Sequence, residues 1–130
     1  MTANRKITIL GSTGSIGEST LDVVNRHPDR FQVFALTANK NVTKMLSQCQ
    51  RFQPRYAVML NSESAEQLSK AIQAANINTE VLSGIESLEK VASHPEVDAV
   101  MAAIVGAAGI RPTFAAARTG KLVLLANKET

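Results

Sequence analysis

The stretch "ITILGSTGSIG" (residues 7–17) runs a short apolar and β-branched segment directly into Gly11, Gly14 and Gly17, which are spaced by threes. A strand that is buried on both faces of a parallel sheet has a continuous apolar sequence, as residues 7–10 do. In a strand–turn–helix unit the first glycine makes the tight turn, the second lets a bound group approach the backbone, and the third lets the helix pack against the strand. The stretch therefore predicts a buried strand, a glycine turn and a helix.

The remaining sequence repeats this alternation of strands and helices. Apolar runs predict further strands, and apolar residues at helical spacing, such as Leu21 and Val24 after Gly17, predict helices that face a core. The expected strands are residues 6–10, 31–37, 56–60, 80–82, 99–104 and 121–125. Alternating strands and helices are typical of a parallel sheet with crossover helices. We therefore expect one α/β domain with a doubly wound, mostly parallel sheet.

Helix ends are indicated by prolines and by a glycine. His27-Pro28 and His94-Pro95 each follow an expected helix, and the residue before a proline is disfavoured in the helical region. The partial negative charge at a helix C-terminus favours an imidazolium, so we expect both histidines to end helices and not to be catalytic. Gly120 is an expected helix C-cap.

Composition excludes several classes of protein. The net charge is +3, but the Lys and Arg residues are scattered and only 4% of residues are aromatic, which disfavours nucleic-acid binding. No apolar run approaches the roughly 18 residues of a membrane span, and residues 1–6 lead straight into an expected strand instead of a signal peptide. The single cysteine, Cys49, excludes an internal disulfide and fits a small buried side chain in a reducing compartment. We therefore expect a cytoplasmic protein with a phosphate-bearing small-molecule ligand, and no nucleic-acid or membrane partner.

The glycine turn has the chemistry of a phosphate site. A helix start presents unpaired main-chain N–H groups and a partial positive charge, and Thr13 and Ser15 add hydroxyl donors. The spacing G-x-x-G-x-x-G is a variant of the dinucleotide-binding motif, and its place after an apolar strand favours a Rossmann-type NAD(P)-binding fold over a purely structural turn. No Gly-Lys-Ser/Thr closes the turn, so it is not a Walker A loop and phosphoryl transfer from ATP is not indicated.

The end of the second strand discriminates between the two dinucleotides. Sites for NAD place a carboxylate about 20 residues past the glycines, where it accepts hydrogen bonds from the ribose hydroxyls. Here the sequence is Thr37-Ala38-Asn39-Lys40-Asn41, which lacks a carboxylate and sets a cation between two amides. These donors suit the 2′-phosphate of NADP(H). The alternative for Lys40 is an ordinary solvated loop lysine.

The last third of the chain adds two more strand ends with distinctive residues. One apolar run leads into small residues at 102–109, which would leave room for a cofactor or allow tight helix packing. The final expected strand leads to Asn127, Lys128 and Glu129 at the same edge of the sheet, where ligands of doubly wound sheets bind. The alternative for these three residues is a helix cap followed by a charged first turn.

Several segments together resemble the 1-deoxy-D-xylulose 5-phosphate reductoisomerase family, the NADPH-dependent enzymes of the non-mevalonate isoprenoid route. The segments are "ILGSTGSIG", "QPRYAVM", "VMAAIVGAAG" and "LLANKE", in family-like order, and the resemblance covers essentially the whole chain. It implies that the cofactor-binding residues are Thr13, Gly14, Ser15 and Ile16 at the phosphates, Asn39, Lys40 and Asn41 around the 2′-phosphate, and Asn127 and Glu129 near the nicotinamide. It also implies that Lys128 binds the substrate.

The chain departs from the family pattern at two positions. Many members have Gly where this chain has Asn39, and a side chain at this position would alter the shape of the implied adenosine pocket. Thr130 stands where Ser is common, which keeps a hydroxyl group.

The family reaction isomerises 1-deoxy-D-xylulose 5-phosphate and reduces the product with NADPH to 2-C-methyl-D-erythritol 4-phosphate. The resemblance implies a divalent cation, Mg or Mn, whose acidic ligands follow this chain together with the catalytic and C-terminal domains, and a homodimer for the full-length protein. We therefore expect residues 1–130 to be an NADPH-binding domain with no catalytic and no metal-binding residue of its own, inactive alone. The alternatives are another Rossmann dehydrogenase module, such as those acting on aspartate semialdehyde or homoserine, and a non-catalytic nucleotide-binding or interaction domain.

Overall fold

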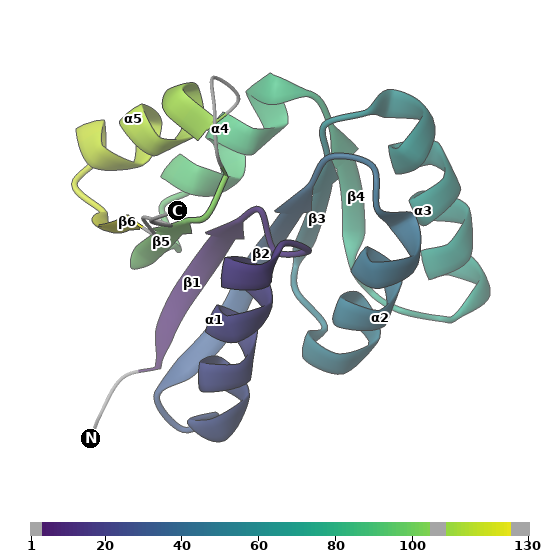
Figure 1. The fold of residues 1–130 in the computed structure, drawn as a ribbon, viewed down its shortest axis with the longest axis horizontal. Helices are drawn as coiled ribbons and strands as arrows, with labels where there is room; N and C mark the ends of the chain where they lie inside the picture. Colours follow the sequence, from purple (N-terminus) through teal and green to yellow (C-terminus); the bar gives the residue numbers. More distant parts are fainter. Residues whose placement is uncertain (1–3, 105–108, 126–130) are drawn as a thin grey trace.

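The computed structural model describes residues 4–104 and 109–125, along which strands and helices alternate (Figure 1). The strands are β1 (Arg5–Leu10), β2 (Phe31–Ala38), β3 (Tyr56–Met59), β4 (Glu80–Ser83), β5 (Ala99–Ala102) and β6 (Leu122–Leu125). The helices are α1 (Ser15–Arg26), α2 (Val42–Phe52), α3 (Ser62–Ala74), α4 (Ile85–Ser93) and α5 (Ile110–Arg118). Each predicted strand is confirmed, with ends within about two residues of those expected.

The strands form one parallel sheet in the order β4-β3-β2-β1-β5-β6. The chain builds outward from β1 through β2, β3 and β4, and then returns to the other side of β1 to add β5 and β6. The point between β1 and β5 is therefore the topological switch point, where ligands of such sheets bind outside the carboxyl ends of the strands. The N–H of Ala103 donates to the carbonyl of Leu10 at 2.9 Å, so the loops after β1 and β5 leave the sheet side by side.

Helices cover both faces of the sheet (Figure 1). On one face α1, α2 and α3 pack against a core that includes Ile9, and on the other α4 and α5 pack around Leu10. Burying one such side chain contributes about 1.5–3 kcal/mol to the free energy of unfolding. The hydroxyl of buried Thr8 donates to the carbonyl of Val91 at 2.8 Å, which ties β1 to α4. These two covered faces confirm the predicted doubly wound α/β fold.

Helix ends lie where the sequence places them. Helix α1 ends at Arg26, directly before His27-Pro28. After α5, Gly120 has a φ of 79°, its N–H donates to the carbonyl of Ala117 at 3.1 Å, and the next N–H, of Lys121, donates to the carbonyl of Ala116 at 3.1 Å. This paired arrangement is the Schellman motif, which uses glycine because only glycine adopts a positive φ without steric cost.

The expectation of an imidazolium at His94 is wrong. His94 does end α4, but its ring packs against Phe34 and Tyr56, with centroid distances of 4.7 Å and 6.1 Å. Nδ1 of His94 accepts the N–H of Glu96 at 3.1 Å, which requires that nitrogen to be unprotonated. Burial lowers the pKa of His94 from its usual 6.5, because desolvation disfavours the charged form of the ring.

Candidate dinucleotide site

The glycines of the turn meet different structural needs. Gly11 has a φ of 83°, and a Cβ there would lie 3.0 Å from the carbonyl oxygen of Ala103. A Cβ on Gly17 would lie 2.2 Å from the carbonyl oxygen of Gly11, so α1 packs on the turn only because residue 17 has no side chain. A Cβ on Gly14 would meet nothing closer than 3.9 Å, so this glycine instead leaves open space beside the turn.

Helix α1 begins with free main-chain donors. Its N-cap is Gly14, which has no side chain to bond the first turn, and the first helical hydrogen bond runs from the N–H of Glu18 to the carbonyl of Gly14 at 2.9 Å. Within residues 4–104 and 109–125, no hydrogen bond is donated by the N–H groups of Ser15, Ile16 or Gly17. Unpaired donors and the positive end of the helix dipole together form a binding position for an anion.

A pocket of about 290 Å³ opens beside this helix start, at the switch point. It is lined by Gly11, Thr13, Gly14, Ala38, Asn39, Leu60, Leu88, Ala103 and Ile104. The structure thus brings together three of the predicted residues, Thr13, Gly14 and Asn39. The side chain of Ile16 lies elsewhere, in a separate apolar pocket with Met101 and Leu124, so only its main chain faces the anion position.

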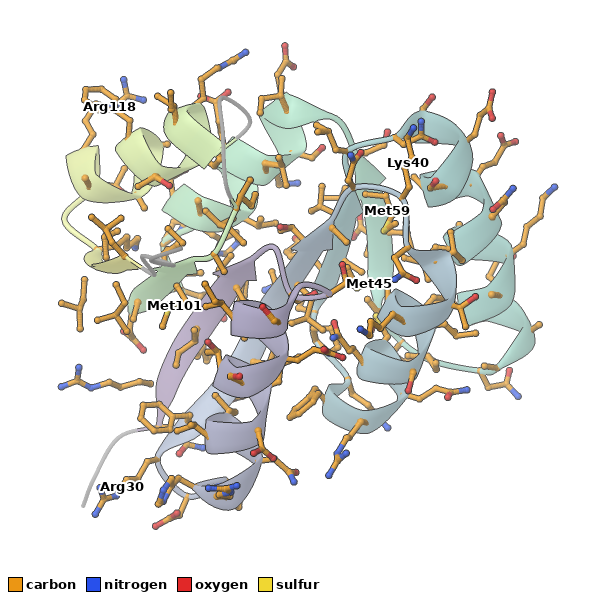
Figure 2. All side chains as sticks on the ribbon, in the orientation of Figure 1. Arg30, Lys40, Met45, Met59, Met101 and Arg118 are labelled. Carbon is orange, nitrogen blue, oxygen red and sulfur yellow. The ribbon has the colours of Figure 1, made fainter. Side chains whose placement is uncertain are left out.

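The segment after β2 places the other predicted residues on the same edge of the sheet. Asn41 is the N-cap of α2, and its side-chain oxygen accepts the N–H of Lys44 at 3.1 Å, which leaves its amide NH₂ available. Lys40 is exposed, and Figure 2 shows it at the end of the molecule toward which the strand arrows point. The carbonyl of Asn39 accepts the N–H of Asn61 at 3.2 Å, so β2 and β3 leave the sheet as neighbours.

A second cation lies next to the turn. Nζ of Lys44 lies 2.8 Å from a carboxylate oxygen of Glu18 and 3.4 Å from the carbonyl oxygen of Thr13. Both side chains of this ion pair are partly exposed, so its net contribution to stability is small, about 0–1 kcal/mol. Its effect is local, because Lys44 offsets the charge that Glu18 brings to the first turn of α1.

The glycine turn is fixed by hydrogen bonds among Ser12, Thr37 and Gln48, which the sequence did not indicate as site residues. The hydroxyl of Thr37 accepts the N–H of Gly11 at 3.0 Å, and the carbonyl of Thr37 accepts the N–H of Ser12 at 2.8 Å. Ser12 and Gln48 exchange two further hydrogen bonds. One signal in the sequence points to Gln48, since it interrupts the otherwise apolar stripe of α2 between Met45 and Cys49, all three of which are buried.

Cys49 has the structural role that the sequence predicts. It is a free, fully buried thiol in the core between α2 and the sheet. Burial raises the pKa of Cys49 to about 12, so the thiol is neutral and unreactive near neutral pH.

Some predicted residues lie outside the described part of the chain. These are Asn127, Glu129 and the substrate-binding candidate Lys128, as well as the small residues at 105–108. Across the described residues, no cluster of three or more His, Cys, Asp or Glu side chains could bind a metal ion. A search of the same residues finds no helix that is both long enough and apolar enough to span a membrane.

A parallel sheet with a glycine turn, an open helix N-terminus and a pocket at its switch point defines a Rossmann-type dinucleotide-binding domain. Comparison with known families gives a more specific result, because the family model for 1-deoxy-D-xylulose 5-phosphate reductoisomerase matches residues 7–130. The chain belongs to the 1-deoxy-D-xylulose 5-phosphate reductoisomerase family. This confirms the resemblance read from the sequence and does not favour another family of Rossmann dehydrogenases.

Individual relatives agree with this membership. The 1-deoxy-D-xylulose 5-phosphate reductoisomerases of Nitrosomonas eutropha and Nitrosospira multiformis are each 73% identical to the chain over all of its 130 residues. The chain spans 32% and 33% of their respective lengths, about a third of each protein.

Solved structures of relatives share the fold closely. A DOX-P reductoisomerase in complex with NADPH, fosmidomycin and magnesium superposes with a TM-score of 0.91 at 45% identity, covering 95% of this chain and 30% of that one. The Zymomonas mobilis 1-deoxy-D-xylulose 5-phosphate reductoisomerase in complex with NADPH gives a TM-score of 0.89 at 42% identity, covering 96% of this chain and 32% of that one. A third structure, of DOX-P reductoisomerase in complex with magnesium, gives a TM-score of 0.92 at 44% identity, covering 96% of this chain and 31% of that one.

Proposed function

We propose that residues 1–130 are the NADPH-binding domain of a 1-deoxy-D-xylulose 5-phosphate reductoisomerase. The whole protein would isomerise 1-deoxy-D-xylulose 5-phosphate and reduce it to 2-C-methyl-D-erythritol 4-phosphate in non-mevalonate isoprenoid biosynthesis. The observation that carries this proposal is the open N-terminus of α1 at the switch point, in a chain whose relatives have been solved with NADPH.

The pyrophosphate of NADPH fits the start of α1. The N–H groups of Ser15, Ile16 and Gly17 are free to donate among the described residues, and Thr13 and Ser15 carry hydroxyls beside them. The open space at Gly14 lets phosphate oxygens approach the backbone. These main-chain donors need no side-chain movement to bind, which favours affinity.

The 2′-phosphate fits the segment after β2. Lys40 supplies a full charge, and Asn39 and Asn41 supply amide donors on either side of it. No acidic residue stands in this segment to repel the phosphate. Because Asn39 lines the pocket, its side chain would contact the adenosine, at the position where many members have Gly.

The nicotinamide end of the site is proposed from the family resemblance. Asn127 and Glu129 would contact the nicotinamide half of the cofactor, and Lys128 would bind the phosphorylated substrate. Bound NADPH supplies a hydride for the reduction. We assign no catalytic residue within this chain.

The divalent cation does not fit the described residues. They offer no cluster of acidic or other ligands, so we propose that Mg or Mn binds to residues of the longer protein outside this domain. We further propose that the whole protein is a cytoplasmic homodimer whose ligands are small molecules, without a nucleic-acid or membrane partner. The free buried thiol of Cys49 is compatible with a reducing compartment.

Substitution of Lys40 tests the cofactor preference. Lys40→Ala should weaken NADPH binding about tenfold to a hundredfold, since a charge-assisted hydrogen bond to phosphate is lost, and should change NADH binding little. Fluorescence titration of both cofactors measures the two dissociation constants. Lys70→Ala, at an exposed lysine of α3, is the matched control and should leave both unchanged. Equal losses of NADPH and NADH binding in Lys40→Ala would contradict the 2′-phosphate role.

A further inference from the structure

A buried polar pair links the glycine turn to α2. The hydroxyl of Ser12 donates to Oε1 of Gln48 at 2.7 Å, and Nε2 of Gln48 donates to the carbonyl oxygen of Ser12 at 2.9 Å. Ser12 is 0% exposed and Gln48 is 8% exposed. One amide group therefore holds both the side chain and the main chain of the same turn residue.

The main chain of the turn is also fixed on its other side. The N–H groups of Gly11 and Ser12 donate to the hydroxyl and the carbonyl of Thr37, at 3.0 Å and 2.8 Å. Together with Gln48, these contacts satisfy the N–H, the carbonyl and the hydroxyl of Ser12. The turn is thereby attached to β2 through Thr37 and to α2 through Gln48. The segment Asn39–Asn41 connects these two elements, since β2 ends just before it and α2 begins just after it.

The chemistry of this pair favours a positioning role over a packing role. Gln48 lies between buried Met45 and Cys49, where an apolar side chain would pack without desolvating an amide. A hydrogen bond in a folded protein contributes only about 0.5–1.5 kcal/mol net, but it fixes direction where an apolar contact does not. Binding sites need their donors held to within about 0.5 Å, and the support of such donors by further hydrogen bonds achieves this.

We propose that Gln48 is a positioning residue for the cofactor. Through Ser12 it sets the orientation of the glycine turn, and thereby aims the first N–H groups of α1 at the pyrophosphate. The proposal rests on the proposed function, since it names how the same site is held in its binding geometry. Gln48 acts through Ser12 in this proposal, since it is not among the residues that line the pocket at the switch point.

Gln48→Glu tests this role through pH. A protonated glutamic acid has the shape of glutamine and can both accept from the Ser12 hydroxyl and donate to the Ser12 carbonyl. An ionised one cannot donate and would place a charge against that carbonyl. The ratio of the NADPH dissociation constants of the variant and the unsubstituted chain should therefore rise with pH, from near one where the acid is protonated to about tenfold or more where it is ionised. Because both dissociation constants in the ratio are measured at the same pH, any effect of the protonation of NADPH itself cancels.

Two controls separate positioning from loss of structure. Gln50→Glu makes the same change at an exposed position of α2, and its ratio should stay near one at every pH. Binding of adenosine 2′-phosphate, which carries no pyrophosphate, should be unchanged in Gln48→Glu, because that ligand relies on the Lys40 segment. Ser12→Ala, which removes one bond of the pair, should weaken NADPH binding to a smaller extent at all pH values and serves if Gln48→Glu does not fold.

The outcomes distinguish this proposal from the proposed function. A chain that binds NADPH, but whose Gln48→Glu ratio does not change with pH, contradicts the positioning role and leaves the cofactor assignment intact. Parallel losses of NADPH and adenosine 2′-phosphate binding in Gln48→Glu also contradict it, since they indicate a general structural defect. Failure of the unsubstituted chain to bind NADPH at any pH would overturn the proposed function itself.

Discussion

Gly14 and Gly17 are three residues apart, yet the absence of a side chain serves different purposes at the two positions. At Gly17 a Cβ would lie 2.2 Å from the carbonyl oxygen of Gly11, so the glycine is required for α1 to pack on the turn. At Gly14 the φ of −81° suits any residue, and the nearest atom to an added Cβ is 3.9 Å away. The fold therefore requires glycine at position 17, whereas at position 14 the proposed function requires it, because the open space there would admit a phosphate.

Alanine at the two positions should separate folding from binding. Gly17→Ala should lower the free energy of unfolding by about 1–3 kcal/mol or more, because the methyl group overpacks a backbone contact. Gly14→Ala should lower it by about 1 kcal/mol or less, since only the quality of the N-cap changes, but should weaken NADPH binding about tenfold or more because the methyl group stands in the path of the phosphate. Urea unfolding and NADPH titration of both variants measure these effects. Tight NADPH binding by Gly14→Ala would contradict the placement of the pyrophosphate at this residue.

The elements of the fold could be predicted because each one has a local signal. The continuous apolar run of β1 and the helical spacing of Gly17, Leu21 and Val24 are properties of neighbouring residues, and all three of these helix residues are buried as predicted. The bonds that hold the glycine turn could not be predicted in the same way. They join Ser12 to Thr37 and Gln48, which come into contact only when β2 and α2 have packed beside β1.

Part of the candidate site also follows from residues that are close in sequence. The glycine spacing predicts the tight turn and the open start of α1 that the structure shows, whereas the role of the segment after β2 in binding a 2′-phosphate stays a prediction. The side chain of Ile16 does not line the pocket at the switch point. Ile16 comes one residue before Gly17, which is on the buried face of α1, so its side chain points in a different direction and lines another pocket. The prediction of an imidazolium at His94 was wrong because it used only the helix end, which is visible in the local sequence. The rings of Phe34 and Tyr56, which pack against His94, belong to β2 and β3 and are distant in the sequence.

The C-terminal end of α4 gives the chain a pH-dependent contribution to stability. Because the pKa of His94 is lower in the folded state than its ordinary 6.5, the unfolded state takes up the proton more readily. The contribution is therefore complete above pH 6.5 and is lost as the pH falls through 6.5 toward the folded-state pKa. Burial is the leading cause. The charged groups that also act on His94 are Glu96, which raises its pKa, and Arg55, Lys90 and Lys121, which lower it.

His94→Asn isolates this contribution. The side-chain oxygen of Asn can accept the N–H of Glu96 as Nδ1 of His94 does, but it does not titrate. The free energy of unfolding of the variant should therefore fall less than that of the unsubstituted chain as the pH is lowered from 7 to 5. Urea unfolding at several pH values measures the two slopes. A steeper fall in the variant would contradict the direction of the pKa shift.

Charge is arranged differently at the two ends of the sheet. At the amino-terminal edge, Glu96 forms ion pairs with Lys6 and Arg55 and lines a pocket of about 340 Å³ with both. That pocket is larger than the one at the switch point, but its carboxylate already pairs with the two cations and would repel a phosphate. At the carboxyl-terminal edge the described residues offer free N–H groups and exposed Lys40. Under the proposed function, the anionic cofactor therefore fits the pocket at the switch point better than it fits this larger pocket.

The most direct test of this account is an NMR titration of the ¹⁵N-labelled chain with NADPH. We expect saturable amide shifts that are largest at Ser15, Ile16 and Gly17, with a second group of shifts at Asn39–Asn41 and little change at Arg55 and Glu96 on the opposite edge. The titration with NADH should move the first group and leave the second nearly unchanged. Shifts confined to the opposite edge, or no saturable shift at the start of α1, would contradict the claim that this helix N-terminus binds the cofactor.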